Sequence, residues 1–286
     1  MRQASLFISH GSPTFALEPG LLGPQLSNLG YHLPRPRAVL VVSPHWMSRQ
    51  LEILAAPALD TVHDFGGFPA ALYRLSYAAP GAPDIAVATR QVLARAGLDA
   101  VLNMERGRDH GAWVPLMHLY PEADIPVIQL SQPATPSPLA LFELGQALAP
   151  LRDQGVMIIG SGSLTHNLYE LRRDEAAQDA DEGYARHFAD WVWTQIEQDR
   201  LDALFDYRRQ APAALRAHPT DEHFLPLFLA LGAAQGERRQ ARRLRGGTTY
   251  GVLAMDSFVF GGPSSGADTS TTATEALSAT PSGAPQ

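Results

Sequence analysis

The sequence predicts one α/β domain with a mostly parallel central sheet covered by helices. Short apolar runs rich in valine, isoleucine and leucine are each closed by glycine, serine, proline or histidine, a pattern typical of buried strands. Between these runs lie longer segments in which apolar residues recur at helical spacing. Because strand-like and helix-like segments alternate along the chain, a parallel sheet with helices packed against it is favoured.

The expected strands are short and mainly apolar, and each runs into turn-forming residues. Four of them are Ser5–Ile8, Ala38–Val42, Ile125–Leu130 and Val156–Ile159. Leu51–Ala55 is a further candidate, and Tyr250–Phe260 is expected to be the last strand. None of the four is long enough for a stable helix, so the strand interpretation is preferred.

Three segments carry the spacing of an amphipathic helix. Asp84–Ala96 and Leu139–Leu151 repeat apolar residues at about every third or fourth position. A third helix is expected from an apolar stripe formed by Tyr184, Phe188, Trp191, Val192 and Ile196. Each of these helices lies between predicted strands, as a parallel sheet requires.

The folded domain is expected to span residues 1–260 of the 286-residue chain. From Gly261 to Gln286 the sequence consists largely of glycine, serine, threonine, alanine and proline, and no hydrophobic period survives. Such a segment cannot bury enough apolar surface to fold, so we expect residues 261–286 to form a disordered tail. The remaining length is near the upper limit for a single hydrophobic core.

Composition excludes several kinds of site. The chain has no cysteine and no lysine, which removes thiolate metal sites, disulfides, the lysine of a phosphate-binding loop and any Schiff base. A net charge of −7 argues against nucleic acid as a partner. No apolar run is long enough for a membrane span or a signal peptide, so we expect a cytoplasmic protein without membrane contact.

Three histidines follow three of the predicted strands. His10 comes after the first strand, His45 after the second, and His166 after the Gly-Ser-Gly-Ser segment that closes the fourth. In an open α/β sheet, ligands gather at the carboxyl ends of the strands. Each histidine alone fits a structural role, but three at one edge favour a shared metal or catalytic cluster.

A fourth candidate lies late in the chain, where two histidines and two carboxylates fall within His218–His223. We expect a loop that enters a helix, with Thr220 or Asp221 as the cap. The acidic residues then either complement the dipole of the first helical turn or deliver a metal ligand, His223 or Glu222. The sequence alone does not decide between these two interpretations.

Two further loops carry histidine. His110 lies between aspartate and glycine before an apolar segment, and fits either a hydrogen-bond donor to substrate or a turn residue. The segment His63–Pro69 is aromatic and glycine-bearing, and fits either a mobile lid or a packed turn. Histidines and carboxylates without sulfur suit Fe(II), Zn(II) or Mn(II). The dinucleotide fingerprint, the nucleophile elbow and the HExxH motif are all missing from the sequence.

Five ordered motifs resemble the class III extradiol ring-cleavage dioxygenases, and most closely their 4,5-DOPA extradiol dioxygenase branch. The resemblance covers about residues 5–260. The motifs are Ile8-Ser9-His10-Gly11-Ser12-Pro13, Val42-Ser43-Pro44-His45-Trp46, Asp109-His110-Gly111-Ala112-Trp113-Val114-Pro115-Leu116, Gly160-Ser161-Gly162-Ser163-Leu164-Thr165-His166-Asn167 and His218-Pro219-Thr220-Asp221-Glu222-His223.

This resemblance implies a role for each histidine. His10 and His45 match the first two metal ligands, and His223 matches the third, with Glu222 as the alternative. His166 matches the histidine beside the metal, either as acid/base or as a further ligand. His110 matches a histidine that faces the substrate.

The resemblance also implies the reaction. It implies one divalent metal per chain, with Fe(II) expected for ring cleavage and Zn(II) possible, and no nucleotide, flavin or haem. The partners would be a small aromatic diol and O2, and the product a ring-opened semialdehyde. Trp46, Phe65 and Trp113 are candidate aromatic walls for the substrate or packing residues. A non-oxygenase metal-binding module of the same fold and a zinc-dependent hydrolase stay as alternatives, and the oligomeric state is open.

Overall fold

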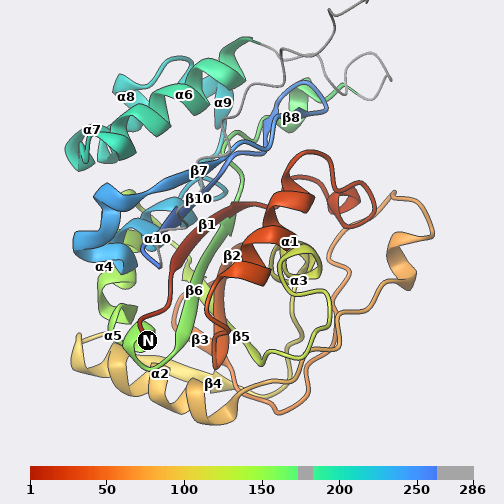
Figure 1. Ribbon diagram of the computed structural model, residues 1–286, viewed down its shortest axis with the longest axis vertical. Coiled ribbons are helices and arrows are strands. Elements are labelled where there is room, and N and C mark those ends of the chain that lie inside the picture. Colours follow the sequence, from red (N-terminus) through yellow and green to blue (C-terminus); the bar gives the residue numbers. More distant parts are fainter. Residues whose placement is uncertain (173–182, 263–286) are drawn as a thin grey trace, which may run out of the picture.

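The computed structural model describes residues 1–172 and 183–262, and its centre is an eight-stranded sheet of order β4-β3-β5-β2-β6-β1-β10-β7 (Figure 1). The strands of this sheet are β1 (Ser5–Ser9), β2 (Ala38–Ser48), β3 (Leu51–Leu54), β4 (Ala100–Asn103), β5 (Val127–Pro133), β6 (Val156–Gly162), β7 (Arg242–Leu244) and β10 (Ser257–Phe260). The strands β8 (Thr248–Thr249) and β9 (Leu253–Ala254) form a separate small sheet.

Helices connect most of the strands. They are α1 (Leu22–His32), α2 (Pro83–Arg95), α3 (His110–Leu119), α4 (Pro138–Leu148), α5 (Pro150–Asp153), α6 (Gly183–Glu197), α7 (Leu201–Phe205), α8 (Tyr207–Gln210), α9 (Ala214–Ala217) and α10 (Pro226–Ala234). Among the described residues, no helix combines the length and the apolar character that a membrane crossing requires.

The central strands run parallel, as predicted. β2 pairs in parallel with both β5 and β6, β6 pairs in parallel with β1, and β3 pairs in parallel with β4. Antiparallel pairs occur towards the edges, between β1 and β10, β10 and β7, and β3 and β5. The predicted α/β class is therefore confirmed. The predicted tail lies outside the described residues beyond Gly262, so its disorder stays a prediction.

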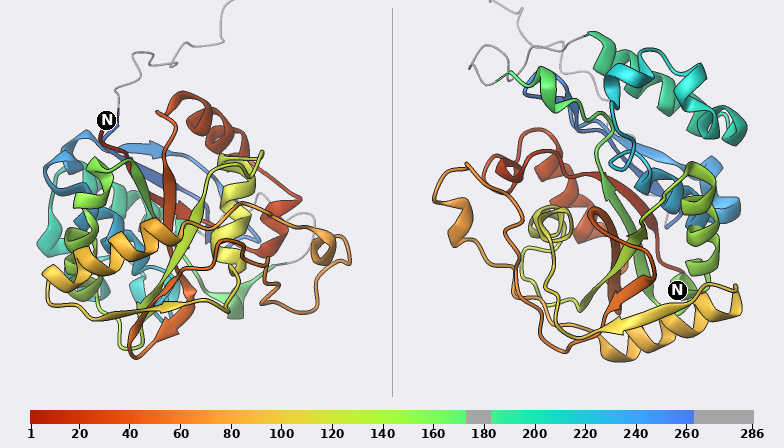
Figure 2. Two further views of the ribbon diagram at one scale, coloured as in Figure 1. Left: turned by 90° about the horizontal axis from the view of Figure 1, so that it is seen from below. Right: turned by 180° about the vertical axis from the view of Figure 1, so that it is seen from behind.

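The sheet is buried on both faces because successive side chains of a strand point in opposite directions. In β2, Leu40 and Val42 belong to one apolar cluster, whereas Val39 and Val41 belong to the other. Figures 1 and 2 show α4 and α10 on the first side of the sheet and α1 and α3 on the second. A strand that is apolar at every position is thus explained by helices on both of its sides.

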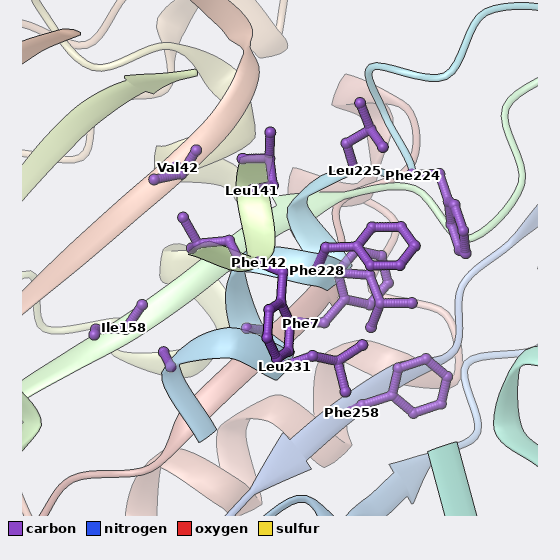
Figure 3. Packing of buried hydrophobic residues seen from close by; sticks show 14 of the residues in the cluster. Phe7, Val42, Leu141, Phe142, Ile158, Phe224, Leu225, Phe228, Leu231 and Phe258 are labelled. Carbon is purple, nitrogen blue, oxygen red and sulfur yellow. The ribbon is translucent and has the colours of Figure 1, made fainter. Parts of the chain in front are cut away.

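The first cluster is dominated by aromatic and leucine side chains. Figure 3 shows Phe7 of β1, Phe258 of β10, and Phe228 and Leu231 of α10 packed together. The ring centroids of Phe7 and Phe258 are 6.0 Å apart, and the rings are stacked. This contact ties the antiparallel strand β10 to the parallel part of the sheet.

One expected strand is wrong in its extent. The chain from Tyr250 to Phe260 does not form one strand, because Tyr250 and Gly251 both have positive φ, 53° and 72°, and turn the chain between β8 and β9. Only Ser257–Phe260 joins the central sheet. An apolar run predicted its burial correctly but gave no sign of the turn.

Two glycines of β6 allow another part of the backbone to approach the strand. A Cβ atom on Gly160 would collide with the carbonyl oxygen of Pro226, and one on Gly162 would collide with that of His223. The segment that leads into α10 therefore lies directly on β6. This close approach fixes the position of His223 relative to the sheet.

Candidate metal centre

Five histidines meet at the carboxyl ends of the central strands. His10 follows β1, His45 lies near the end of β2, and His166 follows β6. His110 is the first residue of α3, and His223 lies in the turn before α10. The structure therefore brings together every histidine to which the resemblance gave a role.

Local backbone features aim these side chains. The register between β2 and β5 shifts between Ser43 and Met47, and such irregularities redirect the side chains of the strand at functional sites. The loop after β6 is joined to the segment before α10, since the Ser163 amide donates to the His223 carbonyl at 2.8 Å. The His166 amide donates to the Ala217 carbonyl at 2.8 Å in the same way.

Three of the imidazoles form a nearly equilateral triangle. Ring centroids are 5.1 Å apart for His10 and His45, 5.0 Å for His45 and His223, and 5.6 Å for His10 and His223. Metal–nitrogen bonds of about 2.0–2.1 Å in a tetrahedral site place imidazole centroids about 5 Å apart. This triangle therefore fits three ligands of one divalent ion.

His110 offers a competing triangle that fits less well. Ring nitrogens of His10, His45 and His110 lie within 4.8 Å of one another, and ligand atoms of His166, Glu222 and His223 form a second group of this kind. However, the His45 and His110 rings have centroids only 3.9 Å apart, which is too close for two ligands of one tetrahedral ion. His223 is thus the better third ligand on geometry.

Hydrogen bonds fix which nitrogen of His10 carries the proton. The Ser161 hydroxyl donates to the Gly111 carbonyl, so its oxygen accepts from His10 Nδ1 at 2.9 Å. His10 Nε2 is therefore a bare lone pair, and it lies 3.2 Å from His45 Nε2. His45 Nδ1 lies 3.5 Å from the Asp64 carboxylate, which favours a proton on that nitrogen. With His45 in this tautomer, a cation between the two Nε2 atoms would be stabilised by both lone pairs.

Glu222 orients the third imidazole. Its Oε1 accepts from His223 Nδ1 at 3.0 Å and from the Thr220 hydroxyl at 3.1 Å. This bond leaves His223 Nε2 as the ligating nitrogen, the usual arrangement of a carboxylate behind a metal-bound histidine. Glu222 is the alternative ligand of the sequence analysis; here it accepts from His223 Nδ1, and its carboxylate also lies within 4.8 Å of ligand atoms of His166 and His223.

Asp64 organises the other side of the cluster. Its Oδ1 accepts from the ring Nδ1 of His110 at 3.0 Å and from the His110 backbone amide at 2.9 Å. Burial alone would raise the pKa of Asp64, but the hydrogen bonds from His110 outweigh it and lower the pKa to about 2. The carboxylate is thus an anion that faces two histidines. Sequence analysis assigned Asp64 no role, because it lies 46 residues from its partner His110 along the chain.

His166 stands differently from the other histidines. Its ring is stacked on that of His223, with centroids 3.5 Å apart and an interplanar angle of 10°. Imidazole nitrogens bind metal along directions within the ring plane, so two parallel stacked rings do not converge on one ion. This geometry favours acid/base work for His166 over ligation.

Comparisons with known proteins identify the family of this chain. Residues 27–254 match the family model described as the catalytic LigB subunit of aromatic ring-opening dioxygenase. The chain belongs to this family. It is 40% identical over 260 residues to a 4,5-DOPA dioxygenase extradiol of Beta vulgaris, covering 90% of this chain and 96% of that one. The same identity over 243 residues links it to a 4,5-DOPA dioxygenase extradiol of Escherichia coli K12, covering 82% and 87% of the two chains.

A solved structure has the same fold. The crystal structure of an uncharacterized protein from Escherichia coli K12 matches with a TM-score of 0.73 and 32% identity, covering 91% of this chain and 100% of that one. The resemblance seen in the sequence is therefore confirmed, and with it the enzyme class of this LigB-family chain, an extradiol ring-cleavage dioxygenase.

Burial favours the neutral form of several histidines of this LigB-type dioxygenase. Desolvation lowers the pKa of His45 to about 3, that of His166 to about 4 and that of His218 to about 3. Burial also lowers the pKa values of His10 and His223 well below the usual range, and the neighbouring imidazoles add to this effect. Neutral imidazole is the form that binds metal and accepts protons.

These pKa values predict acid sensitivity of the metal-free enzyme. An unfolded histidine has a pKa of about 6.5, so below that pH the unfolded chain binds more protons than the folded one. We expect the free energy of unfolding to fall as the pH drops from about 6.5 towards 4, by up to about 1.4 kcal/mol per pH unit for each neutral histidine. Denaturant unfolding of chelator-treated protein at several pH values measures this. The free energy of unfolding of His218→Gln should depend less steeply on pH than that of the wild type. Equal pH dependences would contradict the lowered pKa of His218.

The three candidate aromatic walls lie in different environments. Phe65 contacts the cluster, with its ring centroid 5.5 Å from that of His110 in an edge-to-face arrangement. Trp113 is fully buried and donates from Nε1 to the Val62 carbonyl at 2.9 Å, so it anchors the loop that carries Asp64 and Phe65. Trp46 is also buried and stacks against the Arg106 guanidinium, 5.0 Å from the ring centre.

Two local expectations about the site segments are wrong. Neither Thr220 nor Asp221 caps a helix, because α10 begins only at Pro226 and the residues before it form a turn. His110 does not lie in a loop but opens α3, where the Asp109 carboxylate caps the helix by accepting from the Ala112 amide at 3.3 Å. An aspartate three residues before the capped amide was the signal for this cap.

Proposed function

We propose that this chain is a metal-dependent extradiol dioxygenase that opens the ring of a DOPA-like catechol with O2 to give a ring-opened semialdehyde. One observation supports this most strongly: the Nε2 atoms of His10 and His45 lie 3.2 Å apart, and the centroid of the His223 ring lies 5.6 Å from that of His10 and 5.0 Å from that of His45. The names of the relatives, 4,5-DOPA dioxygenase extradiol, suggest the substrate class.

His10, His45 and His223 would hold the metal. A site of three imidazoles without sulfur suits Fe(II) and Zn(II), and ring cleavage needs a metal that changes its redox state, so we propose Fe(II). When bound, such an ion supplies the electronic connection between an electron-rich diol and O2 that the side chains lack. The Ser161 hydroxyl and the Glu222 carboxylate hold two of the imidazoles with Nε2 free.

His166 and His110 would handle the protons of the diol. A catechol must lose protons to bind through its oxygens, and His166 is neutral and placed beside the ligand His223, so it can accept one and return it later. His110 donates its Nδ1 proton to Asp64, which leaves Nε2 to accept a hydrogen bond from a substrate hydroxyl. The ring of Phe65, edge-on to His110, would close one side of a flat substrate.

Metal loading under anaerobic conditions tests the proposal. Protein loaded with Fe(II) and then exposed to a catechol panel and air should consume one O2 for each catechol and form a yellow product. The matched control is the same protein loaded with Zn(II), which should consume none, because zinc does not change its redox state. Turnover of esters or amides by the zinc form, together with an inactive iron form, would show a hydrolase and overturn the proposal.

A further inference from the structure

An open groove of about 460 Å³ adjoins the metal centre. Its walls include Met47, Ala134, Arg208, Thr220, Asp221 and Glu222. Met47 and Ala134 lie near the carboxyl ends of β2 and β5, the edge of the sheet at which the histidines gather. A larger cavity of about 630 Å³, between the segment after β1 and the β8–β9 hairpin, shares no lining residue with the metal centre.

The groove and the metal centre share part of the chain on two sides. Met47 follows His45 by two residues on the same strand. Glu222 lines the groove and also accepts the hydrogen bond from His223 Nδ1 at 3.0 Å. Glu222 is therefore common to the groove and the histidine cluster, so a molecule bound at the histidines lies next to the groove.

Among the residues that the structure describes, the groove is lined by one cationic and two anionic side chains, and the cation forms no ion pair with either anion. Arg208 uses Nη1 for both of its hydrogen bonds, to the Tyr207 hydroxyl and to the His218 carbonyl, each at 3.3 Å. Within residues 1–172 and 183–262, Arg208 and Asp221 form no ion pair with each other or with another residue. The guanidinium and the carboxylates of Asp221 and Glu222 thus line one groove as separate charges.

Such a groove matches a ligand that is itself a zwitterion. A guanidinium presents several N–H donors in a fork that matches a carboxylate, whereas a carboxylate wall accepts from an ammonium group. A neutral side chain would leave Arg208 and Asp221 without an ion-pair partner, whereas Glu222 keeps its hydrogen bonds from His223 and Thr220. A ligand with only a carboxylate would pair with Arg208 alone, and a ligand with only an ammonium group would pair with the carboxylates alone.

We propose that this groove binds the α-amino acid end of a catechol amino acid, with Arg208 on the carboxylate and Asp221, assisted by Glu222, on the ammonium group. The inference rests on the proposed function, because it assumes that the aromatic ring lies at the histidines. Arg208 and Asp221 are then the residues that select an amino acid over a simple catechol.

Anaerobic binding to the Fe(II)-loaded protein tests this without turnover. Four probes share one ring: L-DOPA, dopamine without the carboxylate, 3,4-dihydroxyphenylpropionate without the ammonium, and 4-methylcatechol without either. Arg208→Gln should raise the Kd of L-DOPA and of the propionate roughly tenfold and leave those of dopamine and 4-methylcatechol unchanged. Asp221→Asn should raise the Kd of L-DOPA and of dopamine alone.

A matched control is the neighbouring Arg209. The Arg209 side chain is 84% exposed, and its Nη1 lies 3.9 Å from Asp206 Oδ2. Arg209 does not line the groove. Arg209→Gln should leave all four Kd values unchanged. Equal effects of Arg208→Gln on all four probes, or equal wild-type Kd values for L-DOPA and 4-methylcatechol, would overturn the groove assignment.

A failure of the proposed function would look different. If the charge-dependent Kd pattern is found but admission of air produces no O2 uptake, ring cleavage is refuted and the groove assignment is supported. If O2 uptake is rapid with all four probes and the Kd values do not depend on their charge, the groove assignment is refuted and ring cleavage stands. If no probe binds the wild type, both are refuted.

Discussion

Replacing His10 with alanine is expected to remove the metal, from about one ion per chain to less than about 0.1, and to abolish ring cleavage. His10 is 1% exposed, and its Nε2 lies 3.2 Å from the Nε2 of His45. Because the site is buried, a side chain from the protein surface does not replace the lost imidazole. Two imidazoles leave a poor chelate. Metal analysis of the purified variant, with circular dichroism to show that it is folded, measures the effect.

Two further variants decide which triangle holds the metal. If the ligands are His10, His45 and His223, then His223→Ala should lose the metal and His110→Ala should keep it. The opposite result would assign the site to His10, His45 and His110. His32→Ala is the matched control, because His32 is exposed at the end of α1, where its ring bonds to the Asn28 carbonyl and contacts Tyr31.

Replacing His166 with phenylalanine is expected to retain the metal and to lower turnover by roughly 10²–10⁴, the usual contribution of a positioned proton-transfer group. Phenylalanine preserves the flat surface that stacks on His223 at 3.5 Å, so the ligand should keep its orientation. Metal content and catechol binding should therefore stay near wild type while kcat falls.

The pH–rate profile separates this role from a purely structural one. A base must be deprotonated to act, so kcat of the wild type should rise with pH through the pKa of that base. In His166→Phe this ascending limb should disappear, because the group that it reports is gone. Metal loss as complete as in His223→Ala would instead make His166 a ligand.

The strand-end histidines were the part of the site that the sequence predicted by physics alone. His10, His45 and His166 each follow an apolar run, and parallel strands bring their carboxyl ends to one edge. His223 and His110 were candidates with an open alternative each until the family resemblance gave them roles, because their positions depend on how the segments of α10 and α3 pack. Asp64 escaped both approaches, since its bond to His110 forms across a loop with no local pattern.

The strands and helices of the fold could also be predicted only where the sequence carries a local pattern. Strands such as Val156–Gly162 are apolar throughout and end at turn residues, which makes them visible. The helix Pro226–Ala234 was expected to begin too early, at Thr220 or Asp221. Every residue in it is buried, so no polar face and no helical period marked where it begins. The four-residue strand Ala100–Asn103 is too short and too exposed to stand out.

The glycines of β6 set a condition for anyone who would transplant this site into another protein. His223 reaches its place because its carbonyl lies against Gly162, and the start of α10 lies against Gly160. A host strand with alanine at either position would push the third imidazole outward, even with all the histidines present. The transferable unit is therefore the three ligands together with a bare stretch of strand, and a design that copies only the side chains should yield a two-histidine site.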